Sequence, residues 1–153
     1  MTNKKRKHIR IWGKFLFVIY LVFLVYFLIF SDWYGRSGVP IGLKYNIVPF
    51  NEIKRYWNLA KAGQLYLFIK NVAGNILIFV PFGIFVTMGS KYRNFFKTTF
   101  LGIGFSLIIE IFQLITEVGC FDVDDIILNT IGVILGFIIY EVFHEVKIKK
   151  KTR

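Results

Sequence analysis

The stretch that decides the fold is Thr99–Thr116, which reads TFLGIGFSLIIEIFQLIT. Its length approaches the roughly 20 apolar residues that a helix needs to cross the hydrocarbon core of a bilayer. Glu110 and Gln113 interrupt it, and polar groups inside a membrane are costly enough to mark a functional site. At about 100° per residue, Gly102, Ser106, Glu110 and Gln113 fall on one stripe of the helix. We expect this stripe to face other protein segments and not lipid.

Three further apolar segments accompany this one in a chain of 153 residues. Hydrophobic residues make up 56% of the chain and aromatic residues 19%, above the roughly 45–50% apolar content of soluble domains. The segments long enough to span a bilayer are 12–30, 65–88, 99–116 and 126–143. We therefore predict an all-α, polytopic membrane protein, in which four transmembrane helices form one bundle and a single domain over residues 1–153.

The basic residues are distributed unevenly between the two sides of such a bundle. The formal net charge is +11, and fourteen of the twenty Lys and Arg lie in the two tails and the 89–98 connection. The other six lie on the opposite side, together with six of the nine acidic residues. Under the positive-inside rule, both termini are cytoplasmic. Because the basic residues flank spans, we expect no nucleic-acid partner.

The long outer connection contains a short amphipathic pattern. Asn51 is expected to cap a helix there, and Gly63 to end it. Apolar and polar residues occupy opposite faces, namely Ile53, Tyr56, Trp57 and Ala60 against Lys54, Arg55, Asn58 and Lys61. Aromatic and basic residues together suit an element in the outer headgroup layer, with a solvated helix resting on the bundle as the alternative.

Polar residues also mark one face of the second span. Asn71 and Asn75 share a face, and Lys70 near them could either reach the membrane surface or pair with a buried carboxylate. Pro81 lacks a backbone donor near the middle of the membrane. We expect a kink at that position.

The fourth span carries a comparable stripe. Asp125 begins it, and Asn129, Gly132 and Gly136 continue it. The GxxxG spacing of the two glycines is expected to let helices approach closely. Asp124 lies off the stripe, and we expect it to stabilise the start of its own helix through capping and the helix dipole.

The polar groups of three spans fall at similar depth. A rise of 1.5 Å per residue places all of them in the outer half of the membrane, beneath the acidic 117–125 loop. We therefore expect an outward-facing polar pocket whose binding residues are Asn71, Asn75, Glu110, Gln113, Asp122, Asp125 and Asn129.

The pocket residues restrict the chemistry without establishing an enzyme. His8 and His144 lie in the cytoplasmic ends, so we predict no metal site and no cofactor, and oxygen ligation of Ca²⁺ or Mg²⁺ is a weaker alternative. Glu110 and Asp125 are the candidates for acid–base catalysis. Nothing identifies a nucleophile, and neither a P-loop nor a Ser-His-Asp set on one side of the membrane is present.

Several short motifs in fixed order carry a resemblance to a known family. They are Asn46-Ile47-Val48-Pro49-Phe50, the run from Asn75 to Pro81-Phe82-Gly83, Glu110-Ile111-Phe112-Gln113, Asp122-Val123-Asp124-Asp125, and Asn129-Thr130-Ile131-Gly132 followed by Gly136. In order and spacing they resemble the VanZ-like family of bacterial membrane proteins. We assign structural roles to Pro49, Pro81, Gly83, Gly132 and Gly136. Many relatives carry an Arg where this chain has Gly119-Cys120-Phe121, so no role of that Arg is transferred.

The resemblance implies a multi-pass protein of the bacterial plasma membrane, with the bilayer itself as a partner. The namesake of the family is linked to low-level resistance to teicoplanin, a lipid-bearing glycopeptide antibiotic that acts outside the cell. We therefore expect the pocket to bind or occlude an amphiphile at the outer leaflet: a lipid headgroup, a lipid-linked cell-wall precursor or the lipoglycopeptide. The alternatives are an intramembrane enzyme that acts on a lipid-linked substrate and a small proton-coupled transporter.

Overall fold

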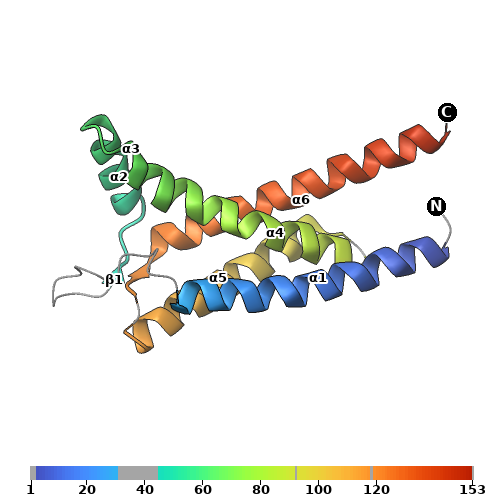
Figure 1. The fold of residues 1–153 in the computed structure, drawn as a ribbon, viewed down its shortest axis with the longest axis horizontal. Coiled ribbons are helices and arrows are strands. Elements are labelled where there is room, and N and C mark those ends of the chain that lie inside the picture. Colours follow the sequence, from blue (N-terminus) through green and yellow to red (C-terminus); the bar gives the residue numbers. More distant parts are fainter. Residues whose placement is uncertain (1–2, 31–44, 92, 118, 153) are drawn as a thin grey trace.

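The fold is known from a computed structural model, which describes residues 3–30, 45–91, 93–117 and 119–152. The elements run in the order α1 (Asn3–Phe30), β1 (Tyr45–Asn46), α2 (Asn51–Lys61), α3 (Leu65–Phe68), η2 (Ile69–Ala73), α4 (Gly74–Gly89), α5 (Phe95–Ile115), β2 (Phe121–Asp122) and α6 (Val123–Thr152). Helices α1, α4, α5 and α6 form an elongated bundle (Figure 1). The all-α prediction is confirmed, with one two-residue strand pair added.

Four helical stretches are long and apolar enough to cross a membrane. They are Lys7–Phe27, Leu65–Gly89, Phe95–Ile115 and Val123–Val146, which differ from the predicted spans by up to five residues at either end. Many large apolar side chains of these helices are exposed, as expected for helices that contact lipid. The chain is therefore a multi-pass membrane protein.

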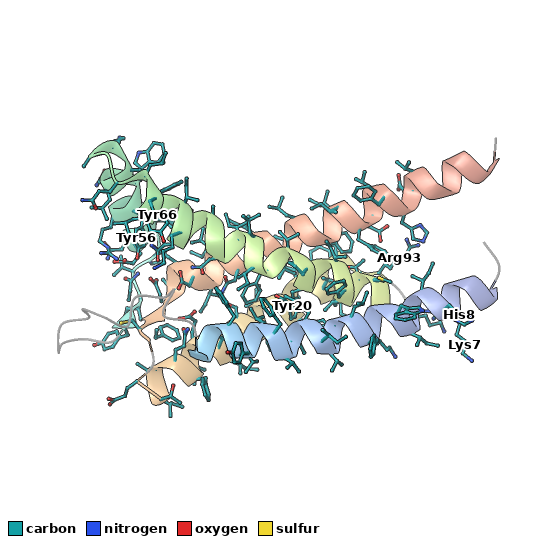
Figure 2. The ribbon with its side chains drawn as sticks, viewed as in Figure 1. Lys7, His8, Tyr20, Tyr56, Tyr66 and Arg93 are labelled. Carbon is teal, nitrogen blue, oxygen red and sulfur yellow. The ribbon has the colours of Figure 1, made fainter. Side chains whose placement is uncertain are left out.

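The two ends of the bundle differ in character. One end carries α2, β1 and β2, and we call it the ladder end; the other carries the start of α1 and the end of α6, and we call it the termini end (Figure 1). Figure 2 shows Tyr56 and Tyr66 at the ladder end, with Lys7, His8 and Arg93 toward the termini end. Arg93 pairs there with Glu141 of α6, at 3.3 Å between Nη1 and Oε2.

Small residues bring α4 and α6 together along most of their shared length. A Cβ atom added to Gly132 would lie 2.2 Å from the carbonyl oxygen of Ile76, and one added to Gly136 would lie 2.1 Å from that of Val80. Gly83 on α4 is equally close to α6, since its Cβ would lie 2.1 Å from the carbonyl oxygen of Val133. The expected close approach at the GxxxG pair is present, and α4 is the partner helix.

The second span is irregular at a place that the sequence did not indicate. α4 continues through Pro81, whereas the wider π turn η2 lies at Ile69–Ala73, nearer the ladder end. A π turn inserts one extra residue into the helical path and so rotates the side chains on either side relative to one another. Below it, the hydroxyl of Tyr20 on α1 donates to the carbonyl oxygen of Ile78 at 2.7 Å, which joins α1 to α4.

A parallel strand pair closes the ladder end. Tyr45 pairs with Phe121 and Asn46 with Asp122, so the segment before α2 is held against the segment before α6. Helix α2 follows, as predicted, and a chain reversal at Gly63 with φ 91° separates it from α3. Trp57 of α2 packs edge-on against Phe68 of α3, with ring centroids 5.7 Å apart. The prediction that Asn51 caps α2 is wrong, because Phe50 occupies the N-cap position, with a φ of 66°.

Candidate functional site

Polar side chains from α4, α5 and α6 meet inside the bundle near the ladder end. The exposed fraction is 3% for Asn75, 2% for Glu110 and 4% for Asn129. Asp125 and Asp122 lie beside them, at the start of α6 and in β2. We call Asn75, Glu110, Asp122, Asp125 and Asn129 the polar cluster. All five are among the residues that the sequence placed in one pocket.

Hydrogen bonds connect the members of this cluster across elements. The side-chain amide of Asn75 donates to Oδ1 of Asp125, which links α4 to α6. The backbone N–H of Asp122 donates to Oε2 of Glu110 at 2.9 Å, which links β2 to α5. The hydrogen-bond donor to Glu110 thus comes from the segment that leads into α6. The strand pair holds that segment in place.

A second contact joins α5 and α6 one helical turn deeper. Nδ2 of Asn129 donates to Oγ of Ser106 at 2.9 Å, and Ser106 is fully buried. Oδ1 of Asn129 is buried and accepts no hydrogen bond from the described residues. Gly102, one turn further along the same stripe, packs against Val133, since an added Cβ would lie 2.6 Å from Cγ2 of that valine.

Asp122 forms the rim of the cluster. Its Oδ1 accepts from the Asn46 side-chain amide at 2.9 Å and from the backbone N–H of Asp124 at 2.8 Å. Burial raises the pKa of Asp122 above its ordinary value of 3.8, and the charges of Asp124 and Glu52 act in the same direction. The two hydrogen bonds oppose this shift but are outweighed.

The cluster presents more acceptor atoms than its own donors use. Glu110, Asp122 and Asp125 each accept hydrogen bonds through one carboxyl oxygen, and no hydrogen bond from the described residues reaches the second oxygen of each. None of the ion pairs among the described residues includes these three carboxyl groups. Together with Oδ1 of Asn129, these are four oxygen atoms that accept no hydrogen bond from the described residues. Such a site favours a ligand that supplies hydrogen-bond donors or positive charge.

Two predicted site residues lie differently from the others. Asn71 is half-buried, and its side-chain amide donates to the carbonyl oxygen of Leu67 in the preceding turn, at 2.8 Å. Gln113 is buried with 8% exposure and lies against Gly119, where an added Cβ would meet its Cβ and Cδ at 3.4 Å. No hydrogen bond among the described residues connects either side chain to the polar cluster.

Asp124 has a different role from the one that its position at a helix start indicates. It is 1% exposed, and its carboxylate accepts from the backbone N–H of Phe50 at 2.5 Å and of Ile53 at 3.1 Å. Its carboxylate therefore caps α2, which corrects the expectation that it caps α6. Its place in the first turn of α6 agrees with the expected dipole contribution. Local sequence contains no sign of this, because any Asp at a helix start looks like a cap for that helix.

Asn46 is a further residue at the candidate site that spacing along the helices did not predict. It lies in the Asn46-Ile47-Val48-Pro49-Phe50 motif, and its side chain both donates to Asp122 and accepts from the backbone N–H of Val48 at 3.2 Å. Pro49 is exposed between β1 and α2. The motif itself was the available signal, since it is one of those that carry the family resemblance.

Comparison with known proteins agrees with this architecture. The family model described as VanZ/LLP1 matches residues 17–144. These residues include about half of the first span, the second and third spans, nearly all of the fourth span and the whole polar cluster. A relative named Protein VanZ, from Enterococcus faecium, is 31% identical over 132 residues, which cover 86% of this chain and 74% of the relative. No solved structure gives a significant match. The chain therefore belongs to the VanZ/LLP1 family.

Proposed function

We propose that this membrane protein binds the polar headgroup of an amphiphile at the polar cluster and so alters the access of that amphiphile to the outer leaflet of the plasma membrane. The observation that carries the proposal is the surplus of acceptors: one oxygen each on Glu110, Asp122 and Asp125 accepts no hydrogen bond from the described residues. Carboxylates that are held by neighbours yet keep an open oxygen suit recognition of ammonium and hydroxyl groups.

Three kinds of amphiphile present such donors at the outer leaflet. They are lipids with an amine headgroup, lipid-linked cell-wall precursors with sugar hydroxyls, and lipoglycopeptides such as teicoplanin. The family resemblance favours the last two, because the namesake is linked to teicoplanin resistance. The distribution of Lys and Arg supports an outward ladder end, since fourteen of the twenty lie on the termini side.

The apolar packing beneath the cluster favours a binding site over a transport path across the membrane. Tyr20, Leu24, Phe79, Phe82, Ile109 and Val133 form a buried apolar core. Phe79 lies one turn below Asn75, and Val133 one turn below Asn129, each toward the termini end. A polar solute that entered from the ladder end would have to displace these buried side chains to cross the membrane.

Direct binding to the full-length protein in lipid nanodiscs tests the proposal. Teicoplanin and a lipid-linked peptidoglycan precursor serve as probes. We expect Glu110→Gln and Asp125→Asn to weaken the binding of at least one probe about tenfold, because a charge-assisted hydrogen bond becomes a neutral one. Glu145→Gln on α6 is the matched control, since Glu145 is exposed at the termini end and should leave affinity unchanged. Equal affinity in all four proteins would contradict the proposal.

The same samples separate binding from catalysis. Glu110 and Asp125 both belong to the polar cluster, and two carboxyl groups in one site can serve as the acid and the base of a catalysed reaction. Mass spectrometry of the precursor after incubation would reveal conversion. A product that forms with the wild type but not with Glu110→Gln would replace the binding proposal by the enzymatic alternative.

A further inference from the structure

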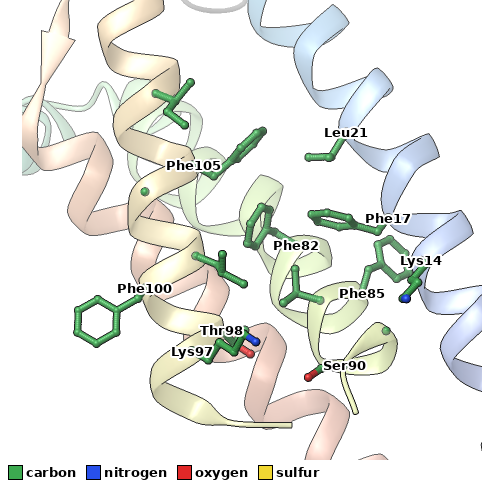
Figure 3. A pocket seen from close by; sticks show the side chains of 15 residues that line it. Lys14, Phe17, Leu21, Phe82, Phe85, Ser90, Lys97, Thr98, Phe100 and Phe105 are labelled. Carbon is green, nitrogen blue, oxygen red and sulfur yellow. The ribbon is translucent and has the colours of Figure 1, made fainter. Parts of the chain in front are cut away.

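A second concavity lies in the other half of the bundle. It is a groove of about 590 Å³ between α1, α4 and α5, within the roughly 300–1,000 Å³ of small-molecule sites. Figure 3 shows Phe17, Phe82 and Phe105 pointing into the space between the three helices. No member of the polar cluster lines this groove, so the two sites are separate.

The groove opens sideways, toward the surface that contacts lipid. Phe100, Leu101 and Ile108 line it and are 69%, 49% and 64% exposed. Gly104 lies between them on α5, and a Cβ added there would meet no atom within 4 Å. The wall therefore leaves open space at Gly104, beside the exposed side chains that face lipid.

The polarity of the groove changes along its length. At the termini end it is lined by Lys14 of α1, Ser90, and Lys97 and Thr98 of α5 (Figure 3). From Lys97 to Ile108 the helix rises roughly 16 Å, and the lining over that distance is apolar apart from Thr98. No Asp or Glu lines the groove, and no ion pair among the described residues includes Lys14 or Lys97.

From this arrangement we infer that the groove holds one acyl chain of an anionic phospholipid, whose phosphate lies between Lys14 and Lys97. The apolar wall accepts the chain, and the two ammonium groups match the charge of the headgroup at the depth where a headgroup lies. A second copy of this chain is a poor occupant, because its termini end is equally basic and would bring like charges together. The lipid comes from the leaflet at the termini end, opposite to that which the polar cluster faces.

Native mass spectrometry of the full-length protein tests the inference. The protein is purified in a mild detergent and titrated with phosphatidylglycerol or with phosphatidylcholine of the same acyl chains. We expect one tightly retained phosphatidylglycerol, with an affinity roughly tenfold above that of phosphatidylcholine, since each lysine attracts the anionic headgroup. In Lys14→Gln/Lys97→Gln this preference should disappear, whereas the weaker retention of phosphatidylcholine should remain.

A variant that fills the groove tests separately whether an acyl chain occupies it. Gly104→Trp should abolish both the tight retention of phosphatidylglycerol and the weaker retention of phosphatidylcholine, because the indole occupies the space that the acyl chain would take. Ile111→Trp is the matched control, since Ile111 is exposed on the same helix but does not line the groove, and it should behave as the wild type. Circular dichroism and the elution volume establish that both variants are folded.

Three results would overturn the inference. They are equal retention of the two lipids by the wild type, an unchanged tight site in Gly104→Trp, and a stable dimer in which a crosslink from Gly104→Cys joins two copies. None of these results bears on the polar cluster, because neither Gly104 nor the two lysines belong to it. Failure here would therefore leave the proposed headgroup site standing.

Discussion

The carboxylate of Asp124 accepts a hydrogen bond from the backbone N–H of Phe50, which lies 74 positions earlier in the chain. The first turn of α6 thereby supplies the side chain that caps the start of α2. Asp122, two residues before it, holds the side chain of Asn46. One short acidic segment thus anchors the outer helix and forms the rim of the polar cluster, so the position of α2 and the state of the cluster are physically connected.

Removal of this cap should loosen α2 while the spans remain folded. In Asp124→Ala, the backbone donors of Phe50 and Ile53 lose their acceptor, at a cost of about 1–2 kcal/mol. Hydrogen exchange of residues 50–54 should accelerate, and that of α4 should not. Asn51→Ala is the control, because the Asn51 side chain makes no capping bond and its loss should be nearly neutral. Equal acceleration in both variants would show that Asp124 is not the cap.

The close contact of α4 and α6 should not tolerate larger side chains. Gly132→Leu and Gly136→Leu would place atoms about 2 Å from carbonyl oxygens of α4, so the two helices must separate. We expect little folded protein and a much lower midpoint of thermal unfolding for any that accumulates. Gly104→Leu is the matched control on α5, since its side chain meets open space. Normal accumulation of Gly132→Leu would contradict the packing described here.

Ser106 should contribute to stability through Asn129. Ser106→Ala removes the acceptor for Nδ2 of Asn129 and leaves a buried amide without a partner, at a cost of about 1–3 kcal/mol. Asn129→Leu should make the additional change Ser106→Ala much less costly, because no amide remains to be satisfied. Thermal unfolding of the two single variants and the double variant measures this coupling. Additive effects would mean that the two side chains do not interact.

Stability at the ladder end should depend on pH through Asp122. Burial raises its pKa in the folded protein above 3.8, so the folded state binds more protons than the unfolded state between the two pKa values. The contribution is fully present below 3.8 and is lost as pH rises through the folded pKa. The midpoint of thermal unfolding should therefore fall over that interval. Asp122→Asn keeps an acceptor for Asn46 and should flatten the dependence, and an unchanged slope would exclude Asp122 as its source.

Orientation can be measured with single cysteines in a Cys120→Ser background. Lys61 is exposed at the end of α2, and Lys91 is exposed in the connection at the termini end, so a cysteine at either position should be accessible. In intact cells, a membrane-impermeant thiol reagent should label Lys61→Cys alone. Labelling of Lys91→Cys alone would reverse the orientation, and the polar cluster would then face the cytoplasm.

The number of spans, their limits within a few residues and the polar stripes follow from the sequence. Each of these properties is local: a bilayer requires about 20 apolar residues, and the 3.6-residue period places Ser106, Glu110 and Gln113 on one face whatever surrounds the helix. For the same reason, the GxxxG pair on α6 could be identified as a close contact before its partner was known. Most of the polar cluster could be listed in this way.

Contacts between distant segments were decided by the tertiary structure. Whether Asp124 caps α6 or α2 depends on where the strand pair places residues 45–50, and no period within α6 carries that information. Asn71 shares a sequence face with Asn75, yet η2 lies between Phe68 and Gly74, and its wider turn alters the helical period on which that prediction relied. The groove at Gly104 lies between α4, α5 and the distant α1, so it exists only once the packing of these three helices is set.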